Sequence, residues 1–117
     1  MSADADAAWP VDLVFDRTQK SLHVAFDDGA KFDIPFELLR VESPSAEVQG
    51  HGPSQKVVVT GKADVGVTKA EPVGRYAVRI IFDDGHDSGL FTWPYLRKLG
   101  REKDSLLQAH RKAARKA

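Results

Sequence analysis

Apolar residues alternate with polar residues along much of the first forty positions, which is typical of β-strands with one buried face. Three segments follow this pattern: Val11–Asp16, Ser21–Phe26 and Ala30–Ile34. The turn between the last two contains Asp-Asp-Gly, which tolerates the positive φ angle of a tight hairpin. Pro35 then suits the first turn of a short helix, PFELLRV. Proline has no backbone N–H, and an N–H group in the first turn of a helix has no acceptor within the helix in any case. This part of the chain therefore predicts antiparallel strands followed by a short helix.

A polar stretch separates this part from a second set of predicted strands. Glu42–Pro53 is rich in Ser, Gly and Pro, which indicates a loop, and the β-branched run Lys56–Thr60 predicts a strand. Further strands are expected at Val65–Glu71, Arg75–Phe82 and Asp87–Thr92, with turns at Pro72-Val73-Gly74 and Asp83–His86. The pattern predicts a second antiparallel group.

Two helices are expected at the end of the chain. Trp93 and Pro94 begin a short helix that we expect to end at Leu99, with Gly100 in the position of a C-terminal cap. Ser105–Lys116 predicts a final helix from its composition. The whole pattern predicts an α+β fold: a small, mainly antiparallel β-sheet domain with short helices and a basic C-terminal helix.

The two halves repeat one arrangement of strand, Phe-Asp-Asp-Gly, strand, and a short helix ending in Leu-Arg. Phe26 corresponds to Phe82, Gly29 to Gly85, and Leu39-Arg40 to Leu96-Arg97. Two such hairpin-plus-helix units can pair around one core, because each covers apolar surface that the other leaves open. A structural role, and not a catalytic one, is therefore assigned to the turn residues Asp27, Asp28, Gly29, Asp83, Asp84 and Gly85.

The length of 117 residues fits one small domain. We divide it into a flexible N-terminus at 1–8, a globular domain at 9–100 and a basic helical tail at 101–117. A content of 42% hydrophobic and 29% charged residues is typical of globular proteins. No apolar run is long enough to span a membrane, and MSADADAAWP lacks the features of a signal peptide, so we expect a cytoplasmic protein without a membrane partner.

The net charge is zero, but the charges are unevenly distributed. Residues 97–117 hold eight Lys and Arg against two acids, whereas residues 1–96 hold nine bases against fifteen acids. The basic tail indicates either a solvated helix face or a contact with an acidic partner or a phosphate backbone. Its RKAARK segment has no aromatic residue or glycine among the bases, so we do not expect a nucleic-acid partner.

The chain has no cysteine, which excludes disulfides, thiolate catalysis and cysteine ligands for zinc or iron–sulfur clusters from this chain. Any metal site must use His, Asp and Glu. His86 with His51, Asp87 and nearby carboxylates such as Glu47 or Asp84 could hold Fe(II), Zn(II) or Ni(II). The alternative is that His86 only stabilises its loop by donating a hydrogen bond to a backbone carbonyl.

The second hairpin differs from the first directly after its turn. His86-Asp87-Ser88-Gly89 stands where the first unit has Ala30-Lys31-Phe32-Asp33. Gly89 within a strand indicates the close approach of another backbone or a ligand. A catalytic set of Ser88, His86 and Asp87 is excluded, since adjacent strand residues point to opposite faces.

Three segments, LLRVESPSAEVQGHGP, EPVGRYAVRIIFDDG and HDSGLFTWPYLRKLG, together resemble the gamma-butyrobetaine hydroxylase N-terminal-like domain in its small stand-alone bacterial form. The resemblance covers roughly residues 10–102. In carnitine-synthesis hydroxylases a similar domain precedes the double-stranded β-helix that holds iron and 2-oxoglutarate. These 117 residues are too few to contain that catalytic domain, so we expect no enzyme activity from this chain by itself.

The resemblance also implies where a metal would lie. In those hydroxylases a Cys-x-Cys-x-x-Cys motif after Leu-Arg, with a distant histidine, binds structural zinc. Ser43, Ser45 and Val48 stand at the three cysteine positions, and His86 stands at the histidine position. Serine and valine are not zinc ligands, so the resemblance predicts that the zinc site of the family is lost here.

Similar domains are also fused to P-loop ATPases of the iron–sulfur carrier type, which implies by analogy a role in cluster assembly or delivery. We therefore predict a non-catalytic binding or adaptor module whose partner is such an ATPase or a metalloenzyme. A small metal-binding protein using His86 and His51, and a remote enzyme with a pocket between the two units, are the alternatives. The predicted binding surface comprises Ser43, Ser45, Glu47, His51, His86, Ser88 and Gly89.

Overall fold

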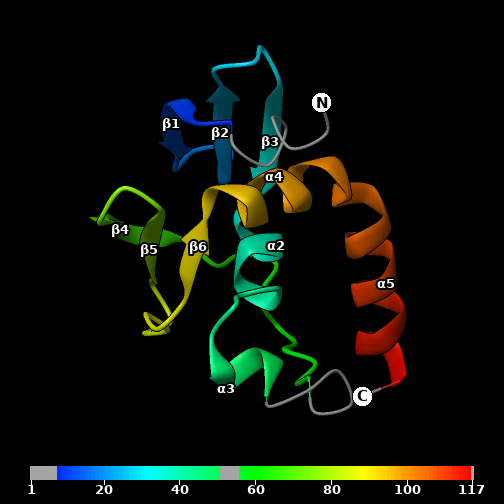
Figure 1. Ribbon diagram of the computed structural model, residues 1–117. Helices are drawn as coiled ribbons and strands as arrows, with labels where there is room; N and C mark the ends of the chain where they lie inside the picture. Colours follow the sequence, from blue (N-terminus) through cyan, green and yellow to red (C-terminus); the bar gives the residue numbers. More distant parts are fainter. Residues whose placement is uncertain (1–7, 51–55, 117) are drawn as a thin grey trace.

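The computed structural model describes residues 8–50 and 56–116, and it confirms the predicted α+β class (Figure 1). The described residues form two three-stranded antiparallel sheets with strand orders β1-β2-β3 and β4-β5-β6. The first unit contains β1 (Pro10–Asp16), β2 (Ser21–Phe26), β3 (Lys31–Pro35) and the helix α2 (Phe36–Val41). The second unit contains β4 (Val67–Val73), β5 (Ala77–Phe82), β6 (Leu90–Thr92) and the helix α4 (Trp93–Arg101).

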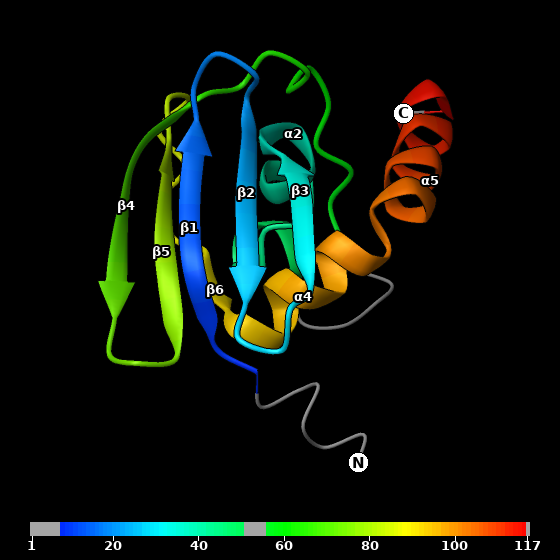
Figure 2. The same cartoon turned by 90° about the horizontal axis from the view of Figure 1, so that it is seen from above.

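Each unit is therefore three antiparallel strands followed by a helix, one strand more than the predicted hairpin-plus-helix repeat. The short helix α3 (Ala46–Gln49) lies between the units, and α5 (Lys103–Lys116) follows the second. In Figure 2 the three strands of the first sheet lie in front, with α2 and α4 behind them and α5 at one side.

The two Asp-Asp-Gly turns adopt the same local structure. Gly29 has a φ angle of 91° and Gly85 one of 93°, a region that glycine enters without steric cost. In both turns the second aspartate, Asp28 or Asp84, accepts a hydrogen bond through Oδ1 from the backbone N–H two residues later, at 3.1 Å. The turn chemistry predicted from the sequence is therefore confirmed in both units.

One hydrophobic core joins the two units. Alternate residues of β2 and β5 point into it, as the period of two predicts, and α2 and α4 cover it with their apolar faces. Burial of this apolar area is the main term that stabilises the fold. Among the fully or almost fully buried side chains are Leu22, Val24, Phe26, Ile34, Phe36, Leu38, Leu39, Ile80, Phe82, Phe91, Leu96 and Leu99.

Three predictions about the middle of the chain are wrong. Lys56–Thr60 pairs with no strand in the described part of the chain, although Val57 N donates to Val48 O at 2.7 Å. A β-branched run favours extended backbone but supplies no strand to pair with. The predicted loop Glu42–Pro53 contains α3, and its last three residues lie outside the described part. Finally, β4 continues through Pro72 and Val73, where a turn was expected.

Gly100 does not cap α4, as the sequence predicted, but lies inside it. A Cβ atom at this position would lie 2.5 Å from both Cβ and Cγ of Phe32 in β3. Glycine therefore allows α4 to approach the first sheet closely. The backbone continues through Arg101 and then turns into α5.

The last helix is anchored to the domain at its N-terminal half. Leu107 is 8% exposed and belongs to the core, and Leu106 packs against the core from the same helix. Ala8, at the other end of the described residues, is also buried. Among the helices that the structure describes, none is both long and apolar enough to cross a membrane.

Candidate functional site

His86 lies directly after the second Asp-Asp-Gly turn and faces the loop that connects α2 to α3. Its Nε2 atom is 2.9 Å from Ser43 Oγ and 3.3 Å from Ser45 Oγ. On the other side of the ring, Nδ1 is 3.3 Å from Glu47 Oε2. Ser88 Oγ donates to Glu47 Oε1 at 2.8 Å. We call these five residues the His86 cluster; in it, both nitrogens of the imidazole ring have polar neighbours.

The loop after α2 brings the two serines together. Ser43 and Ser45 hydroxyls are 3.3 Å apart, and Ser45 N donates to Ser43 Oγ at 3.4 Å. Gln49 in α3 donates through Nε2 to Ser43 O at 2.9 Å, which closes the loop on itself. Val48 is buried on the inner face of α3. The loop therefore presents two hydroxyls, and no other polar side chain of its own, to His86 Nε2.

Gly89 is required by this arrangement. A Cβ atom at this position would lie 2.4 Å from Ser43 Oγ and 3.1 Å from Phe91 Cε1. The sequence predicted a close approach by a backbone or a ligand at Gly89, but the close neighbour is a serine side chain, and Gly89 lies just before β6.

Most residues of the predicted binding surface are buried, so the prediction that they form a surface is wrong for them. Ser43 has no exposed area, while Ser45 and His86 are each 6% exposed, and Gly89 is buried. Only Glu47 and Ser88 are exposed, and they form a rim over the buried groups. The hydrogen bond from Ser88 lowers the pKa of Glu47 below its usual value, with a smaller electrostatic contribution from His86, and together these outweigh partial desolvation.

A charged group lies next to the cluster. Asp84 Oδ2 is 2.8 Å from Arg40 Nε and 2.6 Å from Lys62 Nζ, and Asp84 Oδ1 accepts from the His86 backbone N–H. Burial raises the pKa of Asp84, but hydrogen bonds from Lys62, His86 N–H and Arg40 outweigh it and hold this pKa well below its usual range. The sequence predicted Asp84 as a turn residue and as a candidate metal ligand, but not its ion pairs with Arg40 and Lys62. The repeated Leu-Arg was a signal for Arg40.

The residues present do not fit the zinc site that the resemblance implies. Both hydroxyls are engaged with each other and with His86 Nε2, and Val48 offers no donor atom. Within residues 8–50 and 56–116, no group of three or more His, Cys, Asp or Glu is placed to hold a metal. Asp87 is directed to Arg79, with Oδ2 3.9 Å from Nη2, and His51 lies outside the described residues.

Glu47, His86 and Ser43 have the connectivity of a Ser-His-acid triad, in which an acid orients a histidine that contacts a hydroxyl. Access distinguishes this cluster from an active site, because a nucleophile must reach its substrate and Ser43 is fully buried. A hollow of about 800 Å³ lies elsewhere, between α5 and residues 60–63. The geometry thus supports a cross-link between the two units.

The fold and the cluster together define a small α+β domain built from two repeated units of three strands and a helix. The chain belongs to the gamma-butyrobetaine hydroxylase-like, N-terminal family, whose model matches residues 13–97. This match confirms the resemblance and covers only the N-terminal domain of the hydroxylases. No curated protein matches the chain.

Solved structures of similar proteins share this fold. One NMR solution structure is 42% identical, with a TM-score of 0.81 over 100% of this chain and 89% of that one. A second NMR structure is 45% identical, with a TM-score of 0.76 over 91% and 83%. A crystal structure of a protein of unknown function from Acidithiobacillus ferrooxidans, which belongs to the DUF971 family, is 40% identical, with a TM-score of 0.65 over 78% and 91%.

Proposed function

We propose that this protein is a non-catalytic binding module that serves as an adaptor for a protein partner. The observation that supports the proposal most directly is the complete burial of Ser43. The Glu47, His86 and Ser43 arrangement comes closest to a catalytic geometry, but a substrate cannot reach the serine. The Glu47 and Ser88 side chains remain exposed above it and provide the polar rim of a contact surface.

A fluorophosphonate probe tests the non-catalytic part of the proposal. This reagent labels serines that a neighbouring histidine activates, so we expect no labelling of native protein, with a known serine hydrolase as the positive control. Labelling of Ser43 in the native protein, abolished by Ser43→Ala and by His86→Ala, would instead identify a hydrolytic site and overturn the proposal.

The partner that we propose is an iron–sulfur carrier ATPase or another metalloenzyme, by analogy with the fused forms of similar domains. Isothermal titration calorimetry with the purified carrier ATPase of the same genome, with and without its cluster, measures this directly. We expect Glu47→Lys to weaken the complex, since it reverses the charge at the centre of the exposed rim.

Asp12→Lys is the matched control, because it makes the same charge change at an exposed position on β1. It should leave the affinity within about twofold of the wild type. Absence of a complex with either form of the ATPase counts against this partner. Equal weakening by both variants counts against the rim as the contact surface.

Metal binding through His86 and His51 is the competing proposal. His86 Nε2 already has the two serine hydroxyls as neighbours, and zinc binding there would have to displace them. The contacts of the described residues therefore support the adaptor over the metal carrier.

A further inference from the structure

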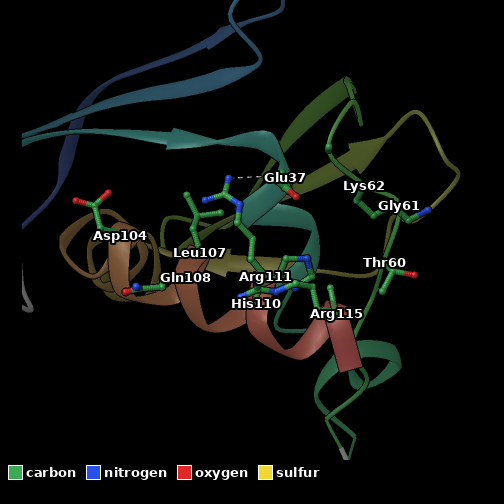
Figure 3. A pocket seen from close by; sticks show the side chains of 12 residues that line it. Glu37, Thr60, Gly61, Lys62, Asp104, Leu107, Gln108, His110, Arg111 and Arg115 are labelled. Carbon is green, nitrogen blue, oxygen red and sulfur yellow. Dashed lines mark ion pairs between the residues drawn. The ribbon is translucent and has the colours of Figure 1, made fainter. Parts of the chain in front are cut away.

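A groove separates the last helix from the rest of the domain. Figure 3 shows its two walls, with Thr60, Gly61 and Lys62 on one side and residues of α5 on the other. The hollow between them measures about 800 Å³, which is the size of a pocket for a few side chains. Leu107, in the N-terminal half of α5, anchors this wall of the groove to the core.

The groove combines an apolar floor with a basic rim. Leu107, Ala63 and Ala114 contribute apolar surface. His110, Arg111, Arg115 and Lys62 contribute nitrogen donors. Such a combination accommodates an apolar side chain with carboxylates on either side of it.

The cations of the rim differ in how far they are already paired. Lys62 is held by Asp84, and Arg111 Nη2 lies 3.8 Å from Glu37 Oε1. The Arg111 side chain is 62% exposed, so this distant pair leaves it accessible, whereas Glu37 is 18% exposed and lies beneath it. Arg115 is exposed one turn further along α5. The accessible charge of this end of the groove is therefore positive.

The other charged residues of α5 add to this positive charge. Five of the residues in α5 are basic and one is acidic: Lys103, Arg111, Lys112, Arg115 and Lys116 against Asp104. On the opposite wall, the lining residues 60–63 include no acid and add one further cation, Lys62. A positive field of this kind favours the approach of anionic segments.

We propose that this groove is a docking site for an acidic segment of a partner protein, in which an apolar residue is flanked by Asp or Glu. The apolar side chain enters the floor near Leu107, and the carboxylates contact Arg111 and Arg115. The site is separate from the Glu47 and Ser88 rim, so it goes beyond the proposed adaptor surface and does not depend on it.

A protein segment fits this groove better than a nucleic acid does. None of the described residues that line it is Phe, Tyr or Trp, the side chains best suited to base stacking, and Glu37 and Asp104 are in its lining, where they would face phosphates. An acidic peptide can instead direct its neutral residues towards these two acids and its carboxylates towards the arginines.

The experiment is a selection of displayed random dodecapeptides on the full chain, with counter-selection on the Arg115→Glu variant. We expect enrichment of sequences with an apolar residue between acidic residues. Synthetic copies of the enriched peptides should lose about tenfold in affinity for Arg115→Glu, because an attraction becomes a repulsion. Amide signals of Leu107, His110 and Ala114 should shift on binding.

Lys112→Glu is the matched control, since it makes the same charge change on an exposed residue of α5 that does not line the groove. Its affinity for the peptides should stay within about twofold of the wild type. Failure to enrich acidic sequences, or equal losses in both variants, would overturn the docking site.

Fluorescence anisotropy with a duplex DNA and a single-stranded RNA oligonucleotide provides the second arm. Binding tighter than that of the selected peptides, with both variants impaired alike, would show a general polyanion surface and overturn the proposal. Binding of the carrier ATPase that is reduced by Glu47→Lys and unaffected by Arg115→Glu would uphold the adaptor surface on its own. The adaptor surface and the docking groove can therefore be disproved independently of each other.

Discussion

Arg40, near the end of α2, donates through Nε to Oδ2 of Asp84 at 2.8 Å, and Asp84 belongs to the hairpin turn of the other unit. The equivalent contact runs in the opposite direction, since Arg97 in α4 donates through Nη2 to Oδ2 of Asp28 at 2.6 Å. Each unit thus supplies the arginine that neutralises the turn aspartate of its neighbour. The repeated Asp-Asp-Gly and Leu-Arg elements join the two units as well as shaping each one.

Replacing Asp84 with Asn should destabilise the fold. The change removes the charge that accepts hydrogen bonds from both Arg40 and Lys62, and the Asp84 side chain is only 19% exposed. We expect the free energy of unfolding to fall by about 2–3 kcal/mol, as measured by urea denaturation. Asp28→Asn is the matched change at a side chain that is 38% exposed, and it should cost clearly less because water screens this ion pair. Equal losses of unfolding free energy in the two variants would contradict a larger contribution to stability from the Arg40–Asp84 pair.

The same aspartate predicts how stability responds to acid. Because the pKa of Asp84 is lower in the folded protein than in the unfolded chain, its contribution is complete above the unfolded value of about 4. The contribution is lost as the pH falls from there through the lower folded pKa. The difference in unfolding free energy between wild type and Asp84→Asn should therefore be constant near neutral pH and shrink below about pH 4. A difference that persists unchanged in acid would refute this assignment.

Gly89→Ala should be destabilising, because the new Cβ atom would lie 2.4 Å from Ser43 Oγ. We expect a loss of about 1–3 kcal/mol, which is typical of overpacking in a close-packed region. Ser43→Ala removes the clashing atom, so the double variant should be more stable than the sum of the two losses by about 1 kcal/mol. Strict additivity in this cycle, measured by thermal or urea denaturation, would mean that the loop relaxes independently of Gly89.

Gly100→Ala tests the contact between α4 and β3. Alanine in place of glycine inside a helix normally stabilises it by about 1 kcal/mol. Here the Cβ atom would lie 2.5 Å from Phe32 Cβ, which is backbone-fixed and cannot rotate away. We therefore expect a net loss of about 1–3 kcal/mol in the free energy of unfolding. A stabilised variant would show that the helix can move away from Phe32 without cost.

Titration with Zn(II), followed by histidine ring NMR signals, tests the state of the His86 cluster. We expect the His86 signals of the tag-free wild type to stay unchanged at about one equivalent, because serine hydroxyls are not zinc ligands. The Ser43→Cys/Ser45→Cys variant places two thiols beside His86 Nε2 and should bind Co(II) with a thiolate charge-transfer band. Saturating, joint shifts of His86 and His51 in the wild type would favour the metal-binding alternative.

Local chemistry explains which parts of the fold could be predicted. The alternation in Ser21–Phe26 reproduces the bounds of β2, because a period of two depends only on neighbouring residues. Asp-Asp-Gly predicted both hairpin turns, since the positive φ angle of Gly29 and of Gly85 is a property of the turn itself.

Predictions that required a partner elsewhere in the chain were less successful. Lys56–Thr60 has the composition of a strand, but pairing depends on where another edge lies in space. Gly100 has the sequence position of a helix cap, yet its role depends on Phe32, which is far away in the sequence. Neither distinction can be made from residues close to the position.

The sequence by itself determined the approximate positions of β1 to β6, the two Asp-Asp-Gly turns and their repetition, although it also predicted a strand at Lys56–Thr60 that does not form. The resemblance singled out Ser43, Ser45 and His86. Only the tertiary structure decided that these three side chains are buried against one another, and that Arg40 pairs with Asp84 in the turn of the other unit. These contacts join residues more than forty positions apart. Their geometry depends on how two apolar faces pack around a common core, and hydrophobic burial is non-directional, so no local pattern encodes it.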